Sequence, residues 1–273
     1  MCIRDSIIPV LPTLERLGVS ADYLQNVDAA AAVHGWFTTF AQAIESGSVA
    51  DVVAHFSPVS AAWRDLLGLS WDLRTLHGQD SIRRYLEENL VSSGLSELQL
   101  NKEGIALQQA TADPVWLEGT FTIQGRKPIQ DLTFVSGTFS FKTKLGLGFG
   151  VIRLIPTRPE GGSGSEWKAF IVFTHLESLK GFPEKIGSLR EQQPLHGGWE
   201  EKREREREFT REGDAPSVVV VGGGQSGLQI AARLKVLGVS TLVVEKQPRV
   251  GDQWRNRYEA LCLHDPVCEL RFA

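Results

Sequence analysis

The sequence predicts an α+β domain followed by the first βαβ unit of an α/β, Rossmann-type dinucleotide-binding domain. Helix-period patterns come first and strand-period patterns follow, which is the order expected of an α+β domain. Later, a β-branched run leads into a glycine motif, a helix and a second apolar strand. A chain of 273 residues has room for two ordinary domains. The expected boundaries are residues 1–27 for an N-terminal lead, 28–176 for the α+β domain, 177–215 for a charged linker and 216–273 for the start of the dinucleotide-binding domain.

Three helices are expected at the start of the α+β domain. Asp28 is a suitable cap for a helix over 29–45, whose apolar side chains form one stripe. A short helix is expected over 49–56, and Asp80 is expected to cap a third over 81–90. From Ser96 the apolar period changes to alternation, which predicts strands over 115–123, 131–144, 149–155 and 167–174. A shift in the apolar phase near Ser136 and Gly137 predicts a bulge. We therefore expect helices packed on a curved antiparallel sheet.

This order of elements resembles the SnoaL-like (nuclear-transport-factor-2-like) cone, in which a long first helix packs into a curled sheet. The resemblance covers residues 28–176 and rests on that order and on the sequences AAAVHGWFTTFAQAIESG and LHGQDSIRRYLEENL. It implies a ligand pocket, a catalytic cavity or a dimer scaffold, so a homodimer through this domain is a candidate assembly. The polar candidates are His34, His55, His77, His175, Asp65 and Glu118. No two of them have the spacing of a metal site or a nucleophile–base pair, so we nominate no catalytic residue and no metal ligand. Five tryptophans could line a pocket, but we interpret them as core residues; they are Trp36, Trp63, Trp71, Trp116 and Trp167.

The linker contains the sequence EEKREREREF, in which acidic and basic residues alternate. Such a pattern is typical of a solvated helix with ion pairs between residues four apart.

The glycine motif begins at the end of a strand over Val218–Val221, which should be buried on both faces of a parallel sheet. Gly222, Gly224 and Gly227 form G-x-G-x-x-G, followed by a helix over 228–237 with Ile230, Leu234 and Leu237 on one face. We expect Gly222 to make the tight turn, Gly224 to let the backbone approach a pyrophosphate and Gly227 to allow close packing of helix on strand. A second strand over 241–244 ends at Glu245, the place of a partner for a ribose hydroxyl. This register predicts a dinucleotide site.

Gly251-Asp252-Gln253-Trp254 follows the acidic residue. Together with the first motif, it resembles the N-terminal flavin-binding segment of the flavin-dependent monooxygenases, which use FAD and NADPH. The family usually has G-G-x-W, so Asp252 replaces a glycine, a change compatible with a loop in which φ is not positive. The resemblance covers residues 216–267, and the order of a SnoaL-like domain, a charged linker and this motif resembles a fungal-type subgroup. The resemblance implies that the glycine motif surrounds the FAD pyrophosphate, with Gly222, Gly223, Gly224, Gln225, Ser226 and Gly227. It also implies that Glu245 bonds to the ribose and that Gln253 and Trp254 lie along the flavin. Leu263 and His264 fall where the family's chain returns towards the flavin.

The implied reaction is an oxygen insertion into a small organic substrate. NADPH reduces the flavin, O₂ adds to it, and the flavin hydroperoxide transfers one oxygen atom, while the protein positions the cofactor and excludes water. The family's second glycine motif, for NADPH, is not in this chain, and we expect the chain to be a fragment that binds FAD weakly and has no NADPH oxidase activity. Two alternatives stay open. One is a segment of an NAD-binding dehydrogenase, and the other is a non-enzymatic SnoaL-like binding or dimerisation module with a vestigial nucleotide-binding tail.

Composition excludes several other classes. The net charge of −4 gives no indication of a basic patch for nucleic acid. The sequence has no run of about 18 apolar residues, so we predict no membrane span. The N-terminus lacks the apolar core of a secretory signal, and three scattered cysteines predict neither disulfides nor a zinc site. These features predict a cytoplasmic protein, and the resemblance to the monooxygenases implies a small-molecule substrate.

Overall fold

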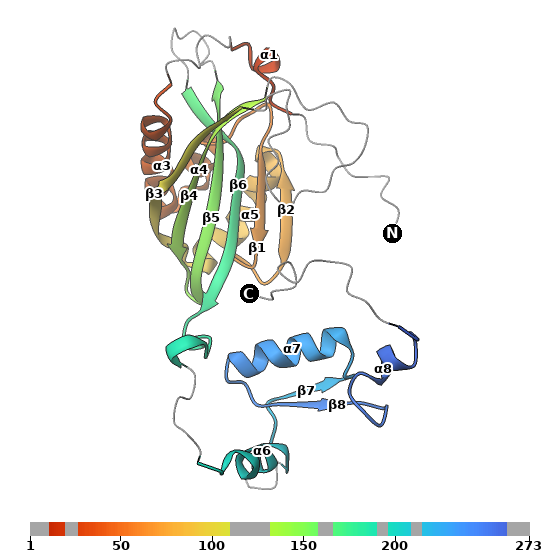
Figure 1. Ribbon diagram of the computed structural model, residues 1–273. Helices are drawn as coiled ribbons and strands as arrows, with labels where there is room; N and C mark the ends of the chain where they lie inside the picture. Colours follow the sequence, from red (N-terminus) through yellow and green to blue (C-terminus); the bar gives the residue numbers. More distant parts are fainter. Residues whose placement is uncertain are drawn as a thin grey trace. The chain divides into compact units, whose positions relative to one another are not determined.

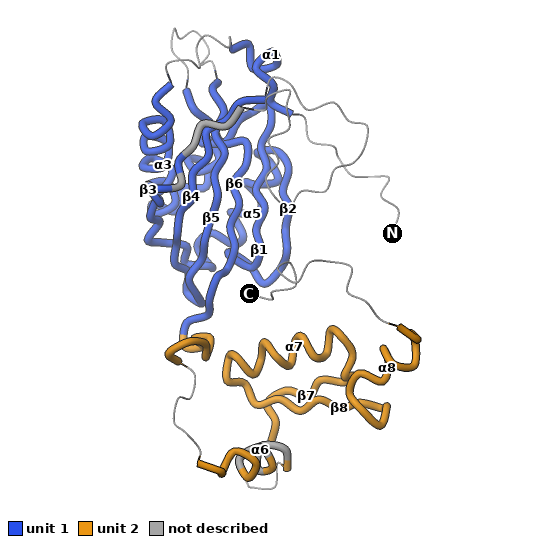
Figure 2. Tube along the Cα trace, viewed as in Figure 1, with its two compact units in different colours: residues 1–180 blue, residues 181–273 orange. Residues whose placement is uncertain are grey.

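The computed structural model describes residues 11–19, 27–109, 132–157, 166–189, 196–208 and 215–260. The chain divides into two compact units, residues 1–180 and 181–273 (Figure 2). Unit 1 contains, in chain order, α1 (Leu14–Leu17), α3 (Ala29–Ser46), α4 (Val49–Ala54), β1 (Ala62–Leu66), β2 (Leu73–His77), α5 (Gln79–Ser93), β3 (Ser96–Gln109), β4 (Thr133–Lys142), β5 (Gly146–Thr157) and β6 (Glu166–Leu179). Unit 2 contains η2 (Gly187–Leu189), α6 (Trp199–Glu208), β7 (Val218–Val221), α7 (Gln225–Val236), β8 (Thr241–Val244) and α8 (Asp252–Arg255).

Unit 1 is a curled six-stranded sheet in the order β2-β1-β6-β5-β4-β3, with α3 and α5 packed against one face (Figure 1). The sheet is antiparallel except where β1 runs parallel to β6. The prediction of an α+β layer with helices on a curved sheet is therefore confirmed.

Helix α3 forms where the sequence predicts it. The Asp28 carboxylate accepts a hydrogen bond from the Ala31 N–H at 3.0 Å, and Gly47 ends the helix in the left-handed region at φ 71°. The apolar stripe is buried and comprises Val33, Trp36, Phe37, Phe40, Ala43 and Ile44. Each of the larger side chains in this stripe, when fully buried, contributes about 1.5–3 kcal/mol through the hydrophobic effect.

Aromatic rings from the sheet fill the space beneath α3. Phe139 and Phe141 are buried on β4, and they lie over Gly150 and Gly148 of the neighbouring strand. A Cβ atom at either glycine would come within 2.2 Å of a ring carbon, so the bare backbone of β5 makes room for these rings. The core of this unit is therefore a packed aromatic layer.

The order of elements in unit 1 differs from the prediction that three helices come first. Strands β1 and β2 lie between α4 and α5, and β3 begins at Ser96, before the predicted strand over 115–123, which lies outside the described residues. The pattern of β1 is hard to recognise because one of its inward residues is the polar Asp65. Strand β2 lies at the edge of the sheet with its first three residues exposed, so it shows no alternation.

One local prediction in unit 1 is wrong, and a second is correct in position but not in strand. Asp80 does not cap α5, because the helix begins at Gln79 and the N-cap is Gly78, which makes no side-chain hydrogen bond. The irregularity near Ser136 and Gly137 is real, but its extra residues are on β3, where the register shifts between Asn101 and Ala106. Strand β4 itself pairs with β5 without a shift.

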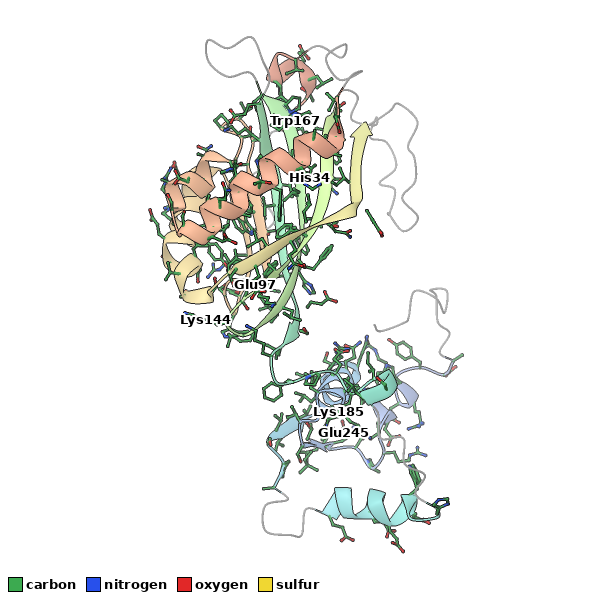
Figure 3. The ribbon with its side chains drawn as sticks, turned by 90° about the vertical axis from the view of Figure 1, so that its left-hand side faces the viewer. His34, Glu97, Lys144, Trp167, Lys185 and Glu245 are labelled. Carbon is green, nitrogen blue, oxygen red and sulfur yellow. The ribbon has the colours of Figure 1, made fainter. Side chains whose placement is uncertain are left out.

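Unit 2 contains the predicted βαβ arrangement. Strands β7 and β8 are parallel, from Val218 opposite Thr241 to Val221 opposite Val244, and α7 connects them. The predicted charged helix is also present, as α6. Residues 181–189, which the sequence assigns to the linker, are attached to the end of α7: Lys185 (Figure 3) donates its N–H to the Val236 carbonyl at 2.8 Å, and Glu184 pairs with Arg233.

The expected burial of this βαβ arrangement is wrong in the described residues. Val219 and Val221 are 53% and 88% exposed, although the strand was expected to be buried on both faces. Ile230 is 52% exposed instead of facing inward. In the part of the chain that the structure describes, this sheet has two strands and one crossover helix, too few elements to cover both faces.

Candidate nucleotide-binding site

The turn between β7 and α7 depends on two of its glycines. Gly222 has φ 104°, a conformation that favours glycine, and its N–H donates to the Val244 carbonyl at 2.7 Å. A Cβ atom at Gly227 would lie 1.9 Å from the Gly222 carbonyl oxygen, closer than two such atoms can approach. The first turn of α7 therefore packs directly on the turn, as the motif requires.

The N-terminus of α7 is open to a ligand. Gly224 is the N-cap, and no side chain caps the helix. The first helical hydrogen bond runs from the Leu228 N–H to the Gly224 carbonyl at 2.9 Å. The N–H groups of Gln225, Ser226 and Gly227 therefore have no acceptor within the helix, and they carry the positive end of its dipole. This arrangement suits a phosphate group.

Glu245 lies beside the same turn, at the end of β8 (Figure 3). One carboxylate oxygen accepts a hydrogen bond from the Gly223 N–H at 2.6 Å, and the other accepts one from the Gln247 N–H at 2.9 Å. The backbone hydrogen bonds from Gln247 and Gly223 lower the pKa of Glu245. The carboxylate is therefore ionised at neutral pH and is fixed next to the glycine turn.

Asp252 has a role that the sequence alone did not indicate. It is the first residue of α8, behind Gly251 at φ 87°, and its own φ is not positive, as the replacement of glycine by aspartate requires. Its side chain is buried, accepts the Arg249 N–H at 3.1 Å, and pairs with the guanidinium groups of Arg249 at 3.2 Å and Arg255 at 3.0 Å. The signal available in the sequence was an aspartate flanked by arginines three residues away on each side.

The loop that Asp252 fixes brings Gln253 to the glycine turn. The Gln253 amide nitrogen lies 3.5 Å from the Gly223 carbonyl oxygen and would be 3.2 Å from a Cβ atom at Gly224. Trp254 lies on α8, half-buried, and its backbone N–H bonds to Gly251. His264 and Leu263 lie outside the described residues. The structure thus brings together the glycine turn, Glu245 and Gln253.

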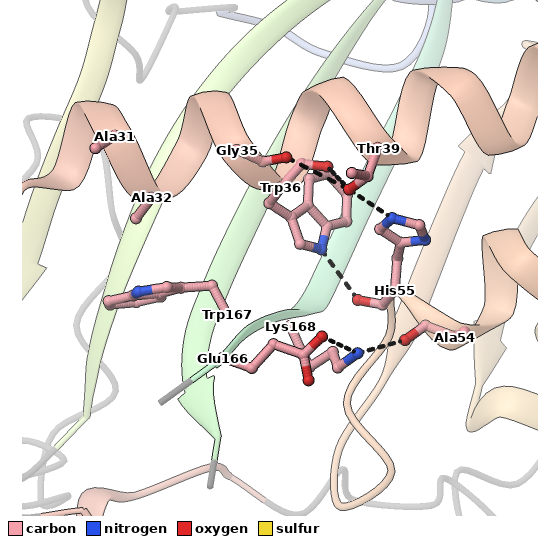
Figure 4. A pocket seen from close by; sticks show the side chains of 10 residues that line it. All are labelled: Ala31, Ala32, Gly35, Trp36, Thr39, Ala54, His55, Glu166, Trp167 and Lys168. Carbon is pink, nitrogen blue, oxygen red and sulfur yellow. Dashed lines mark hydrogen bonds and ion pairs between the residues drawn. The ribbon is translucent and has the colours of Figure 1, made fainter. Parts of the chain in front are cut away.

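Unit 1 contains a pocket of about 540 Å³ beside α3, lined by Trp36, Thr39, His55, Trp167 and Lys168 among others (Figure 4). His55 Nδ1 is 2.7 Å from the Asp51 carbonyl, which can only accept, so this nitrogen carries the proton. Burial, opposed by that hydrogen bond, lowers the pKa of His55. Its Nε2 atom lies 2.9 Å from the Thr39 hydroxyl oxygen, and that hydroxyl also lies 3.0 Å from the Trp36 carbonyl oxygen.

The other polar groups of this pocket are also paired. Lys168 donates to the Ala54 carbonyl at 2.9 Å and pairs with Glu166 at 2.7 Å. Because these polar groups pair with one another, the arrangement indicates a structural role for His55. Across the described ranges, no group of three His, Cys, Asp or Glu residues could hold a metal ion, and Glu118 lies outside those ranges.

A family model and curated relatives match this chain over short stretches. The NAD(P)-binding Rossmann-like domain family matches residues 220–269. Indole-3-pyruvate monooxygenase YUCCA4 of Oryza sativa subsp. japonica is 42% identical over 60 residues, which are 21% of this chain and 14% of that protein. An uncharacterized CzcO-like oxidoreductase of Geobacillus kaustophilus is 43% identical over 49 residues, 18% of this chain and 14% of that protein. The chain thus spans about a seventh of the length of these curated relatives. The matches confirm the resemblance read from the glycine motif and Gly251–Trp254.

Similar solved structures include two proteins of Novosphingobium aromaticivorans. A putative aromatic ring hydroxylase has 16% identity and a TM-score of 0.35, over 56% of this chain and 92% of its own. A putative scytalone dehydratase has 10% identity and a TM-score of 0.35, over 54% of this chain and 83% of its own.

Proposed function

We propose that unit 2 binds the adenosine diphosphate part of FAD and belongs to a monooxygenase that uses FAD and NADPH. The observation that supports this most is the uncapped N-terminus of α7 next to an ionised Glu245, because a diphosphate and a ribose hydroxyl need those two partners at adjacent places. The partial matches to flavin monooxygenase relatives point to the same class.

The residues present fit this cofactor. The diphosphate would accept hydrogen bonds from the N–H groups of Gln225 and Ser226, and the absent Cβ at Gly224 leaves the backbone open to it. Glu245 would accept from a ribose hydroxyl with the lone pairs that its two backbone donors leave free. Gln253 and Trp254 would lie beside the isoalloxazine ring.

Bound FAD would supply the redox chemistry, taking electrons from NADPH and passing them to O₂. The described residues of unit 2 contribute binding and orientation. The domain limits at residues 28–176, 177–215 and 216–273, a homodimer through unit 1 and a cytoplasmic location are further parts of this proposal. Within the described ranges, no helix is long and apolar enough to cross a bilayer.

The test is equilibrium binding of FAD to the purified chain, followed by quenching of flavin fluorescence, with NAD⁺ titrated in parallel. We expect weak binding of FAD, competition by ADP, and loss of binding in Glu245→Ala. Ser240→Ala, on the exposed turn before β8, is the control and should bind like the parent chain. Tighter binding of NAD⁺ than of FAD would favour a dehydrogenase segment instead. Absence of binding by either dinucleotide would favour the non-enzymatic module.

A further inference from the structure

A second pocket in unit 1 lies at the end of the sheet opposite to the His55 pocket. Its volume is about 450 Å³, and it is enclosed by the turn between β1 and β2, the end of α5 and the turn between β4 and β5. Lys144 marks this end of the unit and Trp167 marks the other (Figure 3). Trp71 lines the pocket with a side chain that is 64% exposed, next to Leu67 and Leu145. A cavity of this size accommodates a small ligand with one or two rings.

A buried carboxylate lies directly behind this pocket. Asp65 is 0% exposed. Its Oδ2 atom accepts hydrogen bonds from the Leu69 N–H at 3.1 Å and the Tyr85 hydroxyl at 2.9 Å. Its Oδ1 atom accepts one from the Thr174 hydroxyl at 2.5 Å, and Thr174 in turn accepts from the Trp63 indole N–H at 2.8 Å. A buried carboxylate without such donors would be very unfavourable, so these bonds fix the directions of all the donors around it.

This arrangement determines the hydrogen-bonding character of Ser70. The Tyr85 hydroxyl has one proton, which it gives to Asp65, and its oxygen is also 3.0 Å from Ser70 Oγ. Ser70 must therefore donate its own proton to Tyr85. Burial raises the pKa of Tyr85, so the tyrosine stays protonated at neutral pH and the direction of this chain of bonds does not change. Towards the pocket, Ser70 can then only accept a hydrogen bond.

The turn that carries Ser70 and Trp71 is shaped by the same carboxylate. A Cβ atom at Gly68 would lie 2.6 Å from Asp65 Oδ1, and Leu67 has φ 62°, an uncommon conformation for a leucine. Backbone strain of this kind persists where the surrounding contacts enforce it, and it is found preferentially at functional sites. Asp65 thus places the indole of Trp71 and the oxygen of Ser70 on the same short turn.

We propose that this pocket binds a small, uncharged aromatic compound that carries one hydroxyl or N–H donor. The ring packs against Trp71 and Leu145, and the donor bonds to Ser70 Oγ. Lys144, which also lines the pocket, disfavours a cationic amine. This site is in unit 1 and does not depend on the binding of a dinucleotide by unit 2.

The experiment compares two probes that differ only in the donor, 2-naphthol and 2-methoxynaphthalene, by equilibrium dialysis at pH 7.5 with the full chain. We expect 2-naphthol to bind about five- to tenfold more tightly, the effect of one hydrogen bond. Ser70→Ala should abolish this preference and leave the affinity for 2-methoxynaphthalene unchanged. Trp71→Ala, at an exposed position, should weaken the binding of both probes.

Thr39→Ala in the His55 pocket is the matched control, because it also removes one hydroxyl from a pocket of unit 1, and it should change neither affinity. Equal affinity of the two probes for the parent chain would overturn the proposal. Retention of the preference in Ser70→Ala would also overturn it, as would absence of binding by both probes.

Discussion

Substitution of Gly227 by alanine is the most direct test of the packing in the glycine turn. The new Cβ atom would lie 1.9 Å from the Gly222 carbonyl oxygen, whereas real contacts of this kind are not shorter than 3.0 Å. Helix α7 would have to move by at least 3.0 − 1.9 = 1.1 Å. The carbonyl cannot easily move instead, because the N–H of Gly222 is bonded to Val244 and its φ is positive.

Overpacking against a backbone atom should cost about 3 kcal/mol, the upper part of the usual range. Alanine offsets about 1 kcal/mol of this through its higher helix propensity. The net loss of about 2 kcal/mol corresponds to a roughly 30-fold increase in local opening. Hydrogen exchange measured by mass spectrometry on peptides within 218–244 reports this opening directly.

Gly224→Ala is the matched control. Its Cβ atom would meet only the end of the flexible Gln253 side chain, at 3.2 Å, and replacement of an N-cap glycine costs about 1 kcal/mol or less. Exchange should therefore increase fivefold at most, although both variants should lose FAD binding under the proposed function. Parental exchange rates in Gly227→Ala, or equal acceleration in the two variants, would show that the close packing at Gly227 is not needed.

Three further outcomes follow from contacts in both units. Asp28→Ala should lower the free energy of unfolding of unit 1 by about 1 kcal/mol, because α3 loses its N-cap. Urea denaturation measures this change, and an unchanged midpoint would contradict the prediction. The pKa of His55 is lowered below 6.5, so the folded state binds fewer protons than the unfolded state, and stability should be complete above pH 6.5 and fall as the pH drops below it. His55→Gln should remove that part of the slope in denaturation curves between pH 7.5 and 5.5, and an unchanged slope would exclude His55 as its source. Asp252→Ala should release the loop held by Arg249 and Arg255, so that trypsin cleaves after either arginine several times faster, and unchanged cleavage rates would argue against the anchoring role.

Patterns that lie within a few residues of one another determined much of this protein. The stripe and cap of α3 depend on residues spaced three or four apart, and such spacing is a property of one helix. The same holds for the turn at Gly222, the helix behind Gly227 and the acidic end of β8, which together specify a βαβ unit before any tertiary contact forms. Asp28 and the glycine motif were therefore predictable from the sequence.

The tertiary structure decided what depends on distant partners. The inward position of Asp65, which hides the pattern of β1, is favourable only because donors from other elements reach it. They include Tyr85 of α5 and Thr174 of β6, which is 109 residues away. The hydrogen bond between Glu245 and the Gly223 N–H forms only when β8 pairs with β7, and the exposure of Val219 depends on which elements cover the sheet. No local spacing encodes such contacts, because their free energy arises only when the chain has folded and brought the partners together.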